Sequence, residues 1–236
     1  MKIKILGISG SPRDGNTKMM VEEALKAASK IPDVECSQID LKGKISPCID
    51  CDKCPVNPPD RYCAISDKMD EIYPSLIEAD GIILGSPVYE FTVSAQTKAF
   101  MDRCRPIIRE GMLLHYKVGG AIAVGGGRHG GQEKTISTII DFFIMHGMCP
   151  VGLPLILHAG AAGLAWRPKT ISDDRWFSQY QGRDITAFDE ARQLGSAVAS
   201  LSKVIKAGLE AFDPRKYIEV FKTTKSMKRL IDQNGY

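Results

Sequence analysis

The sequence predicts an α/β fold, a doubly wound parallel sheet of five strands with a cysteine-rich loop and a C-terminal helical extension. The first observation is that short apolar runs alternate with amphipathic stretches of helical period through most of the chain. The second is that loops rich in Gly, Ser and Pro follow three of the apolar runs. In such a sheet the carboxyl ends of the strands meet at one edge, and ligands bind where the strand order reverses. We therefore expect the three loops to lie together there.

The five expected strands differ in how apolar they are. The first, third and fourth are almost wholly apolar, which is typical of parallel strands buried on both faces. The second alternates apolar and polar residues, so we expect it at an edge of the sheet. The fifth is broken by Pro154, which cannot donate a backbone hydrogen bond. The expected strands are 3–8, 34–41, 81–85, 118–124 and 150–157.

Helices are expected wherever apolar residues recur every three or four positions. The first of these patterns ends at Pro32, which marks a helix stop. Residues 42–66 and 158–182 show no period and are expected to be irregular, and the tail from residue 214 is amphipathic and basic. The expected helices are 20–31, 67–79, 92–104, 132–145 and 185–207.

Length, charge and cysteine content narrow the class of protein. The 236 residues suit one domain, residues 1–210, with the loop 42–66 inserted and residues 211–236 as the helical extension. A net charge of +3 argues against nucleic acid as a partner, and no apolar stretch is long enough for a membrane span. Because no signal-peptide pattern is present, we expect the cytoplasm. Seven cysteines, four of them within sixteen residues, suit a reducing compartment better than a disulfide scaffold.

The loop at residues 7–17, G-I-S-G-S-P-R-D-G-N-T, joins the first strand to the first helix and offers amides and hydroxyls to an anion. Its glycines lack the offsets of the dinucleotide fingerprint, and Asn16 stands where a P-loop has its lysine. With a dinucleotide and a nucleoside triphosphate disfavoured, the loop best suits a ligand with one terminal phosphate, such as FMN. The alternative is an ordinary helix start capped by Asn16 or Thr17. The candidate phosphate ligands are Ser9, Ser11, Arg13, Asn16 and Thr17.

The other two loops could hold a flat heterocycle. S-P-V-Y-E-F offers a rigid turn with an aromatic side chain, and G-G-G-R-H-G-G-Q-E lets backbone approach a ring because no Cβ intervenes. Arg128 could place positive charge near the reducible end of the ring. The alternatives are an ordinary βα turn, a flexible glycine turn and a solvated arginine, and no side chain is assigned as a catalytic acid or base. The candidate ring contacts are Pro87, Val88, Tyr89, Gly125, Gly126, Gly127 and Arg128.

The cysteine-rich stretch reads P-C-I-D-C-D-K-C-P, with a fourth cysteine further on. Cys48, Cys51 and Cys54 are spaced three apart, so one turn of chain can offer three thiolates to one metal centre, and Cys63 can complete the set. This spacing resembles the run that holds 4Fe-4S clusters. Free or redox-active thiols and a structural zinc site are the alternatives.

With these motifs the sequence resembles the NADPH-dependent FMN reductase superfamily and, within it, the iron-sulfur flavoproteins. The resemblance covers residues 1–157 and rests on K-I-L-G-I-S-G-S-P-R-D-G-N-T, C-I-D-C-D-K-C, A-D-G-I-I-L-G-S-P-V-Y, S-A-Q-T-K-A-F-M-D-R and G-G-G-R-H-G-G-Q-E. It implies a flavodoxin-like fold, FMN with its phosphate and ring on the candidate residues above, and dimers or tetramers that complete the flavin sites. It also implies a 4Fe-4S cluster on the four cysteines. The gap of eight residues before Cys63 is longer than in the compact motif.

The expected activity is an FMN-dependent oxidoreductase that couples flavin chemistry to one-electron transfer through the 4Fe-4S cluster. One alternative is an NAD(P)H-dependent FMN or quinone reductase without a cluster, with NAD(P)H as a substrate. Another is a non-enzymatic flavin electron carrier. The expected partners are a redox protein such as ferredoxin or a small-molecule acceptor, and a second copy of the chain in a homodimer or homotetramer.

Overall fold

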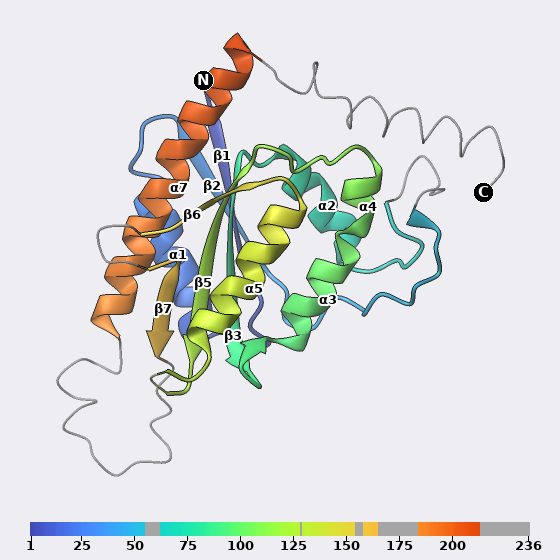
Figure 1. Ribbon diagram of the computed structural model, residues 1–236, viewed down its shortest axis with the longest axis horizontal. Coiled ribbons are helices and arrows are strands. Elements are labelled where there is room, and N and C mark those ends of the chain that lie inside the picture. The colour runs from blue at the N-terminus through green and yellow to red at the C-terminus, as the bar shows by residue number, and fades with distance from the viewer. Residues whose placement is uncertain (55–61, 128, 154–157, 165–183, 213–236) are drawn as a thin grey trace.

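The structure, a computed structural model, places a parallel sheet at the centre of the chain (Figure 1). It describes residues 1–54, 62–127, 129–153, 158–164 and 184–212. The strand order is β2-β1-β3-β5-β6, so the chain moves outward from β1 in one direction and then reverses to the other. This order confirms the predicted doubly wound α/β fold. The strands are β1 (Ile3–Ser9), β2 (Val34–Asp40), β3 (Gly81–Tyr89), β5 (Val118–Gly125) and β6 (Cys149–Val151).

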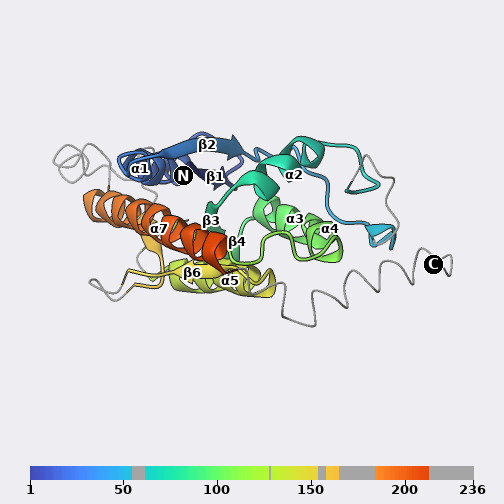
Figure 2. The same cartoon turned by 90° about the horizontal axis from the view of Figure 1, so that it is seen from above.

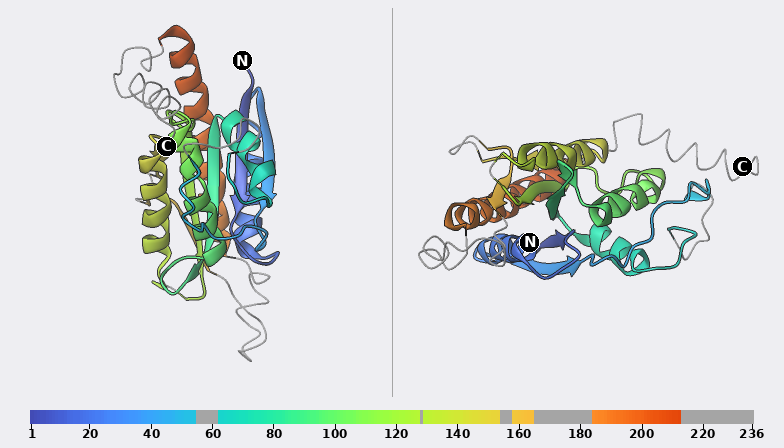
Figure 3. Two further views of the ribbon diagram at one scale, coloured as in Figure 1. Left: turned by 90° about the vertical axis from the view of Figure 1, so that its right-hand side faces the viewer. Right: turned by 90° about the horizontal axis from the view of Figure 1, so that it is seen from below.

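Two layers of helices cover the sheet, as Figure 2 and Figure 3 show from different sides. One face packs on α1 (Asn16–Ala28) and α7 (Ile185–Ala211). The other face packs on α2 (Met69–Glu78), α3 (Ala95–Arg103), α4 (Arg105–Arg109) and α5 (Gln132–Met145).

Side chains of β1 alternate between these layers. Ile3 and Ile5 belong to the core under α1 and α7, whereas Leu6 and Ile8 belong to the core on the opposite face. The helices α1 and α7 approach so closely that a Cβ at Gly195 would lie 1.9 Å from the carbonyl oxygen of Ala24. Only glycine allows this approach. A strand buried on both faces explains why the run is apolar without a period of two.

The fifth position of the sheet is filled by two short strands. β6 pairs with the first part of β5, residues 118–120, and β7 (Ala161–Leu164) pairs with the second part, residues 122–125. The expectation that residues 158–182 are irregular was therefore wrong at β7, which consists only of Ala, Gly and Leu and so lacks a strand signature. Residues 154–157 of the predicted fifth strand lie outside the described residues.

The predicted helix 92–104 begins three residues late. Its first two residues form β4 (Thr92–Val93), which pairs antiparallel with the end of β3. The hairpin turns at Glu90 and Phe91, whose φ angles of +48° and +63° place both in the left-handed region. Two successive left-handed residues are the geometry of a tight hairpin turn. The helix α3 then starts after Ser94, which caps it.

The predicted C-terminal extension, residues 211–236, falls almost wholly outside the described residues, because α7 ends at Ala211. Among the helices that the structure does describe, none is both long enough and apolar enough to cross a membrane.

Candidate functional site

The loops that follow β1, β3 and β5 lie at one edge of the sheet, because these three strands are parallel neighbours. We call this the carboxyl edge (Figure 1). Each of the three loops carries candidate residues from the sequence.

The first loop leads into a helix start that no side chain caps. Gly15 is the N-cap of α1, and no side-chain hydrogen bond is made there, so the alternative that Asn16 or Thr17 caps the helix was wrong. The Asn16 amide instead donates to the carbonyl oxygen of Leu164 in β7, at 3.2 Å. Ser11 Oγ donates to the Arg13 carbonyl oxygen at 2.7 Å and accepts from the Arg13 amide at 3.2 Å, which shapes the loop. The first N–H groups of α1 therefore remain for an external anion.

Charges around this loop are largely paired. Lys18 Nζ lies 2.8 Å from Asp40 and 3.0 Å from Asp14, and Lys42 Nζ lies 2.7 Å from Asp14. The hydrogen bonds to Asp40 and then to Asp14 raise the pKa of Lys18. Arg13 is exposed and has no ion-pair partner among the described residues. It is thus the cation of the loop that is left for a ligand.

A buried hydroxyl network joins the first loop to the second. Gly10 donates its N–H to the carbonyl oxygen of Gly85 at 2.7 Å and accepts from Ser94 Oγ at 2.8 Å. Thr97 Oγ1 donates to Ser86 Oγ at 3.1 Å and lies 3.0 Å from Ser94 Oγ. A Cβ at Gly10 would lie 1.8 Å from Thr97 Oγ1, so only glycine fits. Sequence reasoning missed these hydroxyls, although a serine directly before a helical pattern is a recognisable cap signal.

Of the other first-loop candidates, Ser9 and Thr17 are buried, with exposed fractions of 1% and 4%. The structure thus brings all five predicted phosphate residues into one loop and helix start, but it assigns different tasks to them. Ser11 and Asn16 have intramolecular partners, whereas Arg13 is exposed and the start of α1 has no side-chain cap.

One glutamine side chain holds the glycine loop, residues 125–131, through two hydrogen bonds. Gln132 Nε2 donates to the Gly127 carbonyl oxygen at 2.7 Å, and Gln132 Oε1 accepts from the Gly130 amide at 2.8 Å. Cβ atoms built at Gly126 and Gly127 would meet no atom within 4 Å, so both face open space. At Gly125 a Cβ would lie 2.6 Å from Gln132 Nε2. Gly125 therefore admits the glutamine, and the other two glycines leave room for a ligand.

The second and third loops touch each other. A Cβ at Gly131 would lie 2.8 Å from the Phe91 Cα. Tyr89 and Phe91 expose 40% and 65% of their surface beside this contact. Arg128 lies outside the described residues. The end of β3 contains the three residues predicted from the second loop, Pro87, Val88 and Tyr89.

The carboxyl edge fits a ligand with a phosphate at one end and a flat ring at the other. An uncapped helix start beside an arginine stabilises a phosphate dianion. The glycine loop has two open glycine positions and contacts the loop of the partly exposed Tyr89 and Phe91 through Gly131, which leaves room for a planar ring. No catalytic acid or base is needed for such an arrangement, because the reactive atoms belong to the cofactor.

The cysteine loop follows β2, and all of its cysteines are free thiols. Cys48 is exposed and Cys51 is half-buried, whereas Cys54 and Cys63 are buried. Burial raises the pKa of Cys54, the positive charge of Arg105 opposes this, and the three other thiols raise it further. Each of the other three thiols therefore acts electrostatically on Cys54. Among the described residues, no three Cys, His, Asp or Glu side chains are placed to share a single metal ion.

A buried arginine closes the base of the cysteine loop. Arg103 is 1% exposed and forms a two-pronged ion pair with Asp67, at 2.9 Å and 3.1 Å. It also donates to the carbonyl oxygens of Ser46 and Ile65, at 3.0 Å and 3.1 Å. Burial acts to raise the pKa of Asp67, but hydrogen bonds from Arg103 and from the amides of Ser46 and Met69 outweigh it and lower the pKa. This clamp joins both ends of the loop to α3 and was not foreseen from sequence.

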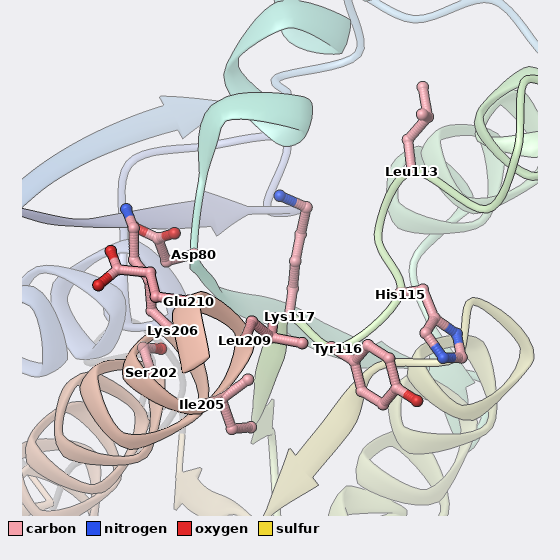
Figure 4. Close-up of a pocket in the computed structure, with 10 residues that line it drawn as sticks. All are labelled: Asp80, Leu113, His115, Tyr116, Lys117, Ser202, Ile205, Lys206, Leu209 and Glu210. Carbon is pink, nitrogen blue, oxygen red and sulfur yellow. The ribbon is translucent and has the colours of Figure 1, made fainter. Parts of the chain in front are cut away.

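A separate cavity of about 300 Å³ lies at the opposite edge of the sheet, the amino edge, between α7 and the start of β5 (Figure 4). Three of its charged groups, Asp80, Lys117 and Lys206, have intramolecular partners. Lys206 Nζ contacts Asp80 Oδ2 and the Lys2 carbonyl oxygen, each at 2.9 Å, and Lys117 Nζ donates to the carbonyl oxygens of Ile77 and Ala79. The cavity lies where α7 packs against the residues that precede β3 and β5.

Comparison with known proteins identifies the family. The family model for NADPH-dependent FMN reductase matches residues 3–161. The chain belongs to this family. An iron-sulfur flavoprotein of Methanocaldococcus jannaschii is 45% identical over 207 residues, which cover 86% of this chain and 100% of that protein. An iron-sulfur flavoprotein of Archaeoglobus fulgidus is 46% identical over 149 residues, covering 62% of this chain and 74% of that protein.

Among solved structures, a flavodoxin, a WrbA-like protein from Agrobacterium tumefaciens, has a TM-score of 0.58 at 18% identity, covering 86% of this chain and 98% of that one. This likeness confirms the flavodoxin-like fold. The family membership confirms the resemblance seen in the sequence and shows that the chain is a flavin oxidoreductase.

Proposed function

We propose that the chain is an FMN-dependent oxidoreductase whose flavin exchanges single electrons with a 4Fe-4S cluster on Cys48, Cys51, Cys54 and Cys63. The observation that carries the flavin part is the carboxyl edge, where an uncapped helix start after β1 and two open glycine positions after β5 lie at the same edge of the sheet. When bound, FMN supplies the ability to take up two electrons together and release them one at a time.

Residues of three loops would bind this cofactor. The N–H groups at the start of α1 and the Arg13 guanidinium would hold the phosphate, and Ser11 would keep the loop in shape. The ring would lie over Gly126 and Gly127, with Tyr89 beside it. The buried hydroxyl network of Ser86, Ser94 and Thr97 fixes two of the loops relative to each other.

The cluster part is supported by the donor set. The loop carries four free thiols, and three of them act electrostatically on the fourth, Cys54. In a four-iron cluster each cysteine binds a different iron, so the ligands surround a wider centre than a single ion. Cysteines that hold such a cluster therefore need not converge on a point where one ion would sit.

Anaerobic purification tests both parts. We expect FMN near one per chain, a visible spectrum with flavin and iron-sulfur bands, and about four irons and four sulfides per chain. A preparation with FMN but no iron or sulfide would contradict the cluster and leave the flavin enzyme. A preparation without FMN would contradict the whole proposal.

A double substitution tests the phosphate site. Ser11→Ala with Arg13→Ala removes a loop-shaping hydroxyl and the outward cation, so FMN affinity should fall at least about tenfold. Lys44→Ala is a matched control, because this exposed lysine lies outside the loop. Unchanged FMN affinity in the double variant would show that the phosphate lies elsewhere.

A second candidate function is an NAD(P)H-dependent flavin or quinone reductase without a cluster. The exposed Tyr89 and Phe91 favour it, because they form an apolar shelf where a second flat molecule could stack against the ring. Rapid bleaching of the flavin by NADPH in protein that lacks iron would support this candidate. Fast electron exchange with ferredoxin and no turnover with NADPH would instead support an electron carrier.

The proposed setting is the cytoplasm, where reducing conditions keep the seven thiols free. The proposed electron partner is a redox protein such as ferredoxin or a small-molecule acceptor, and the proposed assembly is a homodimer or homotetramer. Sedimentation velocity of the holoprotein would measure the assembly directly.

A further inference from the structure

Arg105, at the start of α4, forms ion pairs from both terminal nitrogens of its guanidinium to the turn at residues 48–54, which we call the tip of the cysteine loop. Nη1 lies 3.1 Å from Asp50 Oδ1, and Nη2 lies 3.2 Å from Asp52 Oδ1. The two carboxylates stand on either side of Cys51 in the sequence. One side chain of the helical layer therefore spans the centre of the three-cysteine turn.

The backbone of this turn needs to be held. Asp50 and Asp52 have φ angles of +46° and +53°, a region that residues with a Cβ adopt at a cost. Aspartate tolerates this region better than most residues do, but no glycine is present between Cys48 and Cys54 to relieve the strain. The two ion pairs hold the carboxylates of the two left-handed residues themselves.

The fold does not depend on these ion pairs. Asp50 and Asp52 are 89% and 78% exposed, and exposed ion pairs stabilise a folded chain only slightly. The buried Arg103 and Asp67 already close the base of the loop. Arg105 thus acts on the tip alone, where Cys48, Cys51 and Cys54 lie.

We propose that Arg105 is a positioning residue for the cysteine loop: it holds the turn around Cys51 in one shape and keeps a fixed positive charge beside the thiolates. The electrochemical part rests on the proposed cluster. The shape part does not, because the contacts are present in the chain alone.

Proteolysis measures the shape of the loop with or without a cluster. Lys53 is exposed at the tip, and a lysine-specific protease can cut after it only when the turn opens. In the full chain, before and after chelation of iron, Arg105→Ala should be cut at Lys53 about fivefold faster than the wild type. Each rate of cleavage at Lys53 is divided by the rate measured for the same variant unfolded in urea. This ratio corrects for any difference in how well the protease cuts the changed sequence.

Matched variants separate the contact from general damage. Asp50→Asn with Asp52→Asn keeps residues that accept left-handed backbone but removes both ion pairs, so it should also open the turn. Arg109→Ala removes an exposed arginine from the same short helix and should leave the cleavage rate unchanged. Arg105→Lys keeps the charge but loses the two-pronged grip, so cleavage should be intermediate.

The midpoint potential separates charge from shape. Loss of the positive charge in Arg105→Ala should lower the potential of the cluster, because the reduced form carries one more negative charge. The double asparagine variant, which loses two negative charges, should raise it, and Arg105→Lys should stay near the wild type. A variant that merely damaged the fold would not move the potential in opposite directions for the two sides of one ion pair.

These results discriminate between the two proposals. Unchanged cleavage and unchanged potential in Arg105→Ala, or equal changes in Arg109→Ala, would overturn the positioning role while the cluster remained. If the wild-type chain purified anaerobically contains no iron and cleavage at Lys53 is still faster in Arg105→Ala, the cluster is overturned and the shape role is supported. Opened loops together with opposite shifts in potential would support both.

Discussion

The two edges of the sheet differ in how their polar groups are engaged. At the carboxyl edge α1 starts without a side-chain cap, Arg13 has no ion-pair partner among the described residues, and two glycines face open space. At the amino edge there is a cavity of about 300 Å³, but Lys206, Lys117 and Asp80 are all bound to other parts of the chain. The comparison teaches that a ligand site is recognised by donors that lack intramolecular partners, and that an empty volume alone does not mark one. The four predictions that follow test this division, because a substitution at one edge should change ligand binding and a substitution at the other should change stability.

The largest effect is expected from Gly10→Ala at the carboxyl edge. The new Cβ would collide with Thr97 Oγ1 and disturb the buried hydroxyl network, so the free energy of unfolding should fall by about 4 kcal/mol and FMN affinity should fall with it. Urea unfolding and a flavin titration measure the two effects. Adding Thr97→Ala removes the colliding oxygen and should restore part of the stability. Gly15→Ala, whose Cβ would come no nearer than 3.8 Å to Arg13 Nε, should lose far less stability, up to about 1 kcal/mol, because alanine is disfavoured at a helix N-cap but meets no collision there.

The next effect is a pH dependence that belongs to the amino edge. His146 follows α5, is 2% exposed, and burial lowers its pKa from 6.5 to about 4. Between pH 6.5 and 4 the unfolded chain binds the proton and the folded chain does not, so stability should decline as the pH falls through this window, by about 2 to 3 kcal/mol. His146→Leu should flatten the decline measured by urea unfolding at each pH.

FMN affinity should follow the same pH profile in His146→Leu and in the wild type, because the histidine is remote from the carboxyl edge. The matched control is His129→Asn, at an exposed left-handed position of the glycine loop, which should keep the wild-type stability profile. An undiminished decline in His146→Leu would assign the acid sensitivity to other groups.

A smaller effect is expected for Asp80→Ala. This carboxylate accepts from the Lys4 amide and from Lys206 Nζ, each at 2.9 Å, and so ties β1 to α7. Its loss should reduce the free energy of unfolding by about 1 to 2 kcal/mol and leave FMN affinity within about twofold of the wild type. A large loss of flavin affinity would mean that the two edges are coupled, which the division between them does not allow.

The smallest effect on stability separates two open glycines at opposite edges. Gly126→Ala and Gly208→Ala each add a Cβ that would meet no atom within 4 Å. Gly208 lies in α7, so its substitution should stabilise the chain by up to about 1 kcal/mol without changing FMN affinity. Gly126→Ala should change stability by less than about 1 kcal/mol but weaken FMN binding severalfold, because the methyl group enters the space proposed for the ring.

Most of the fold could be predicted because its signals are local. Apolar runs such as residues 118–124 and helical periods such as residues 132–145 report burial directly, and the doubly wound order follows from their alternation. The exceptions depended on tertiary contacts. β7 is a strand only because β5 offers it a pairing edge, and the hairpin turn at Glu90 and Phe91 has no glycine or asparagine to announce it.

The candidate site shows the same limit at the level of side chains. The loops could be placed together from topology, but the partners of individual residues could not. Asn16 and Ser11 turned out to have intramolecular partners, and Gly125 makes room for Gln132. The Arg103 clamp joins residues that are 36 apart in sequence, so it has no local pattern to detect. The flavin contacts and the iron ligands named from the sequence therefore stay predictions.

The division of the fifth strand has a consequence for aggregation. A long, flat edge strand offers a row of unpaired backbone groups to which another chain can add a strand. At this edge β6 contributes three residues and β7 contributes four, and they pair with different parts of β5. Neither is long enough to act as a template for a further strand. The interrupted edge therefore protects the sheet from extension by a neighbouring molecule.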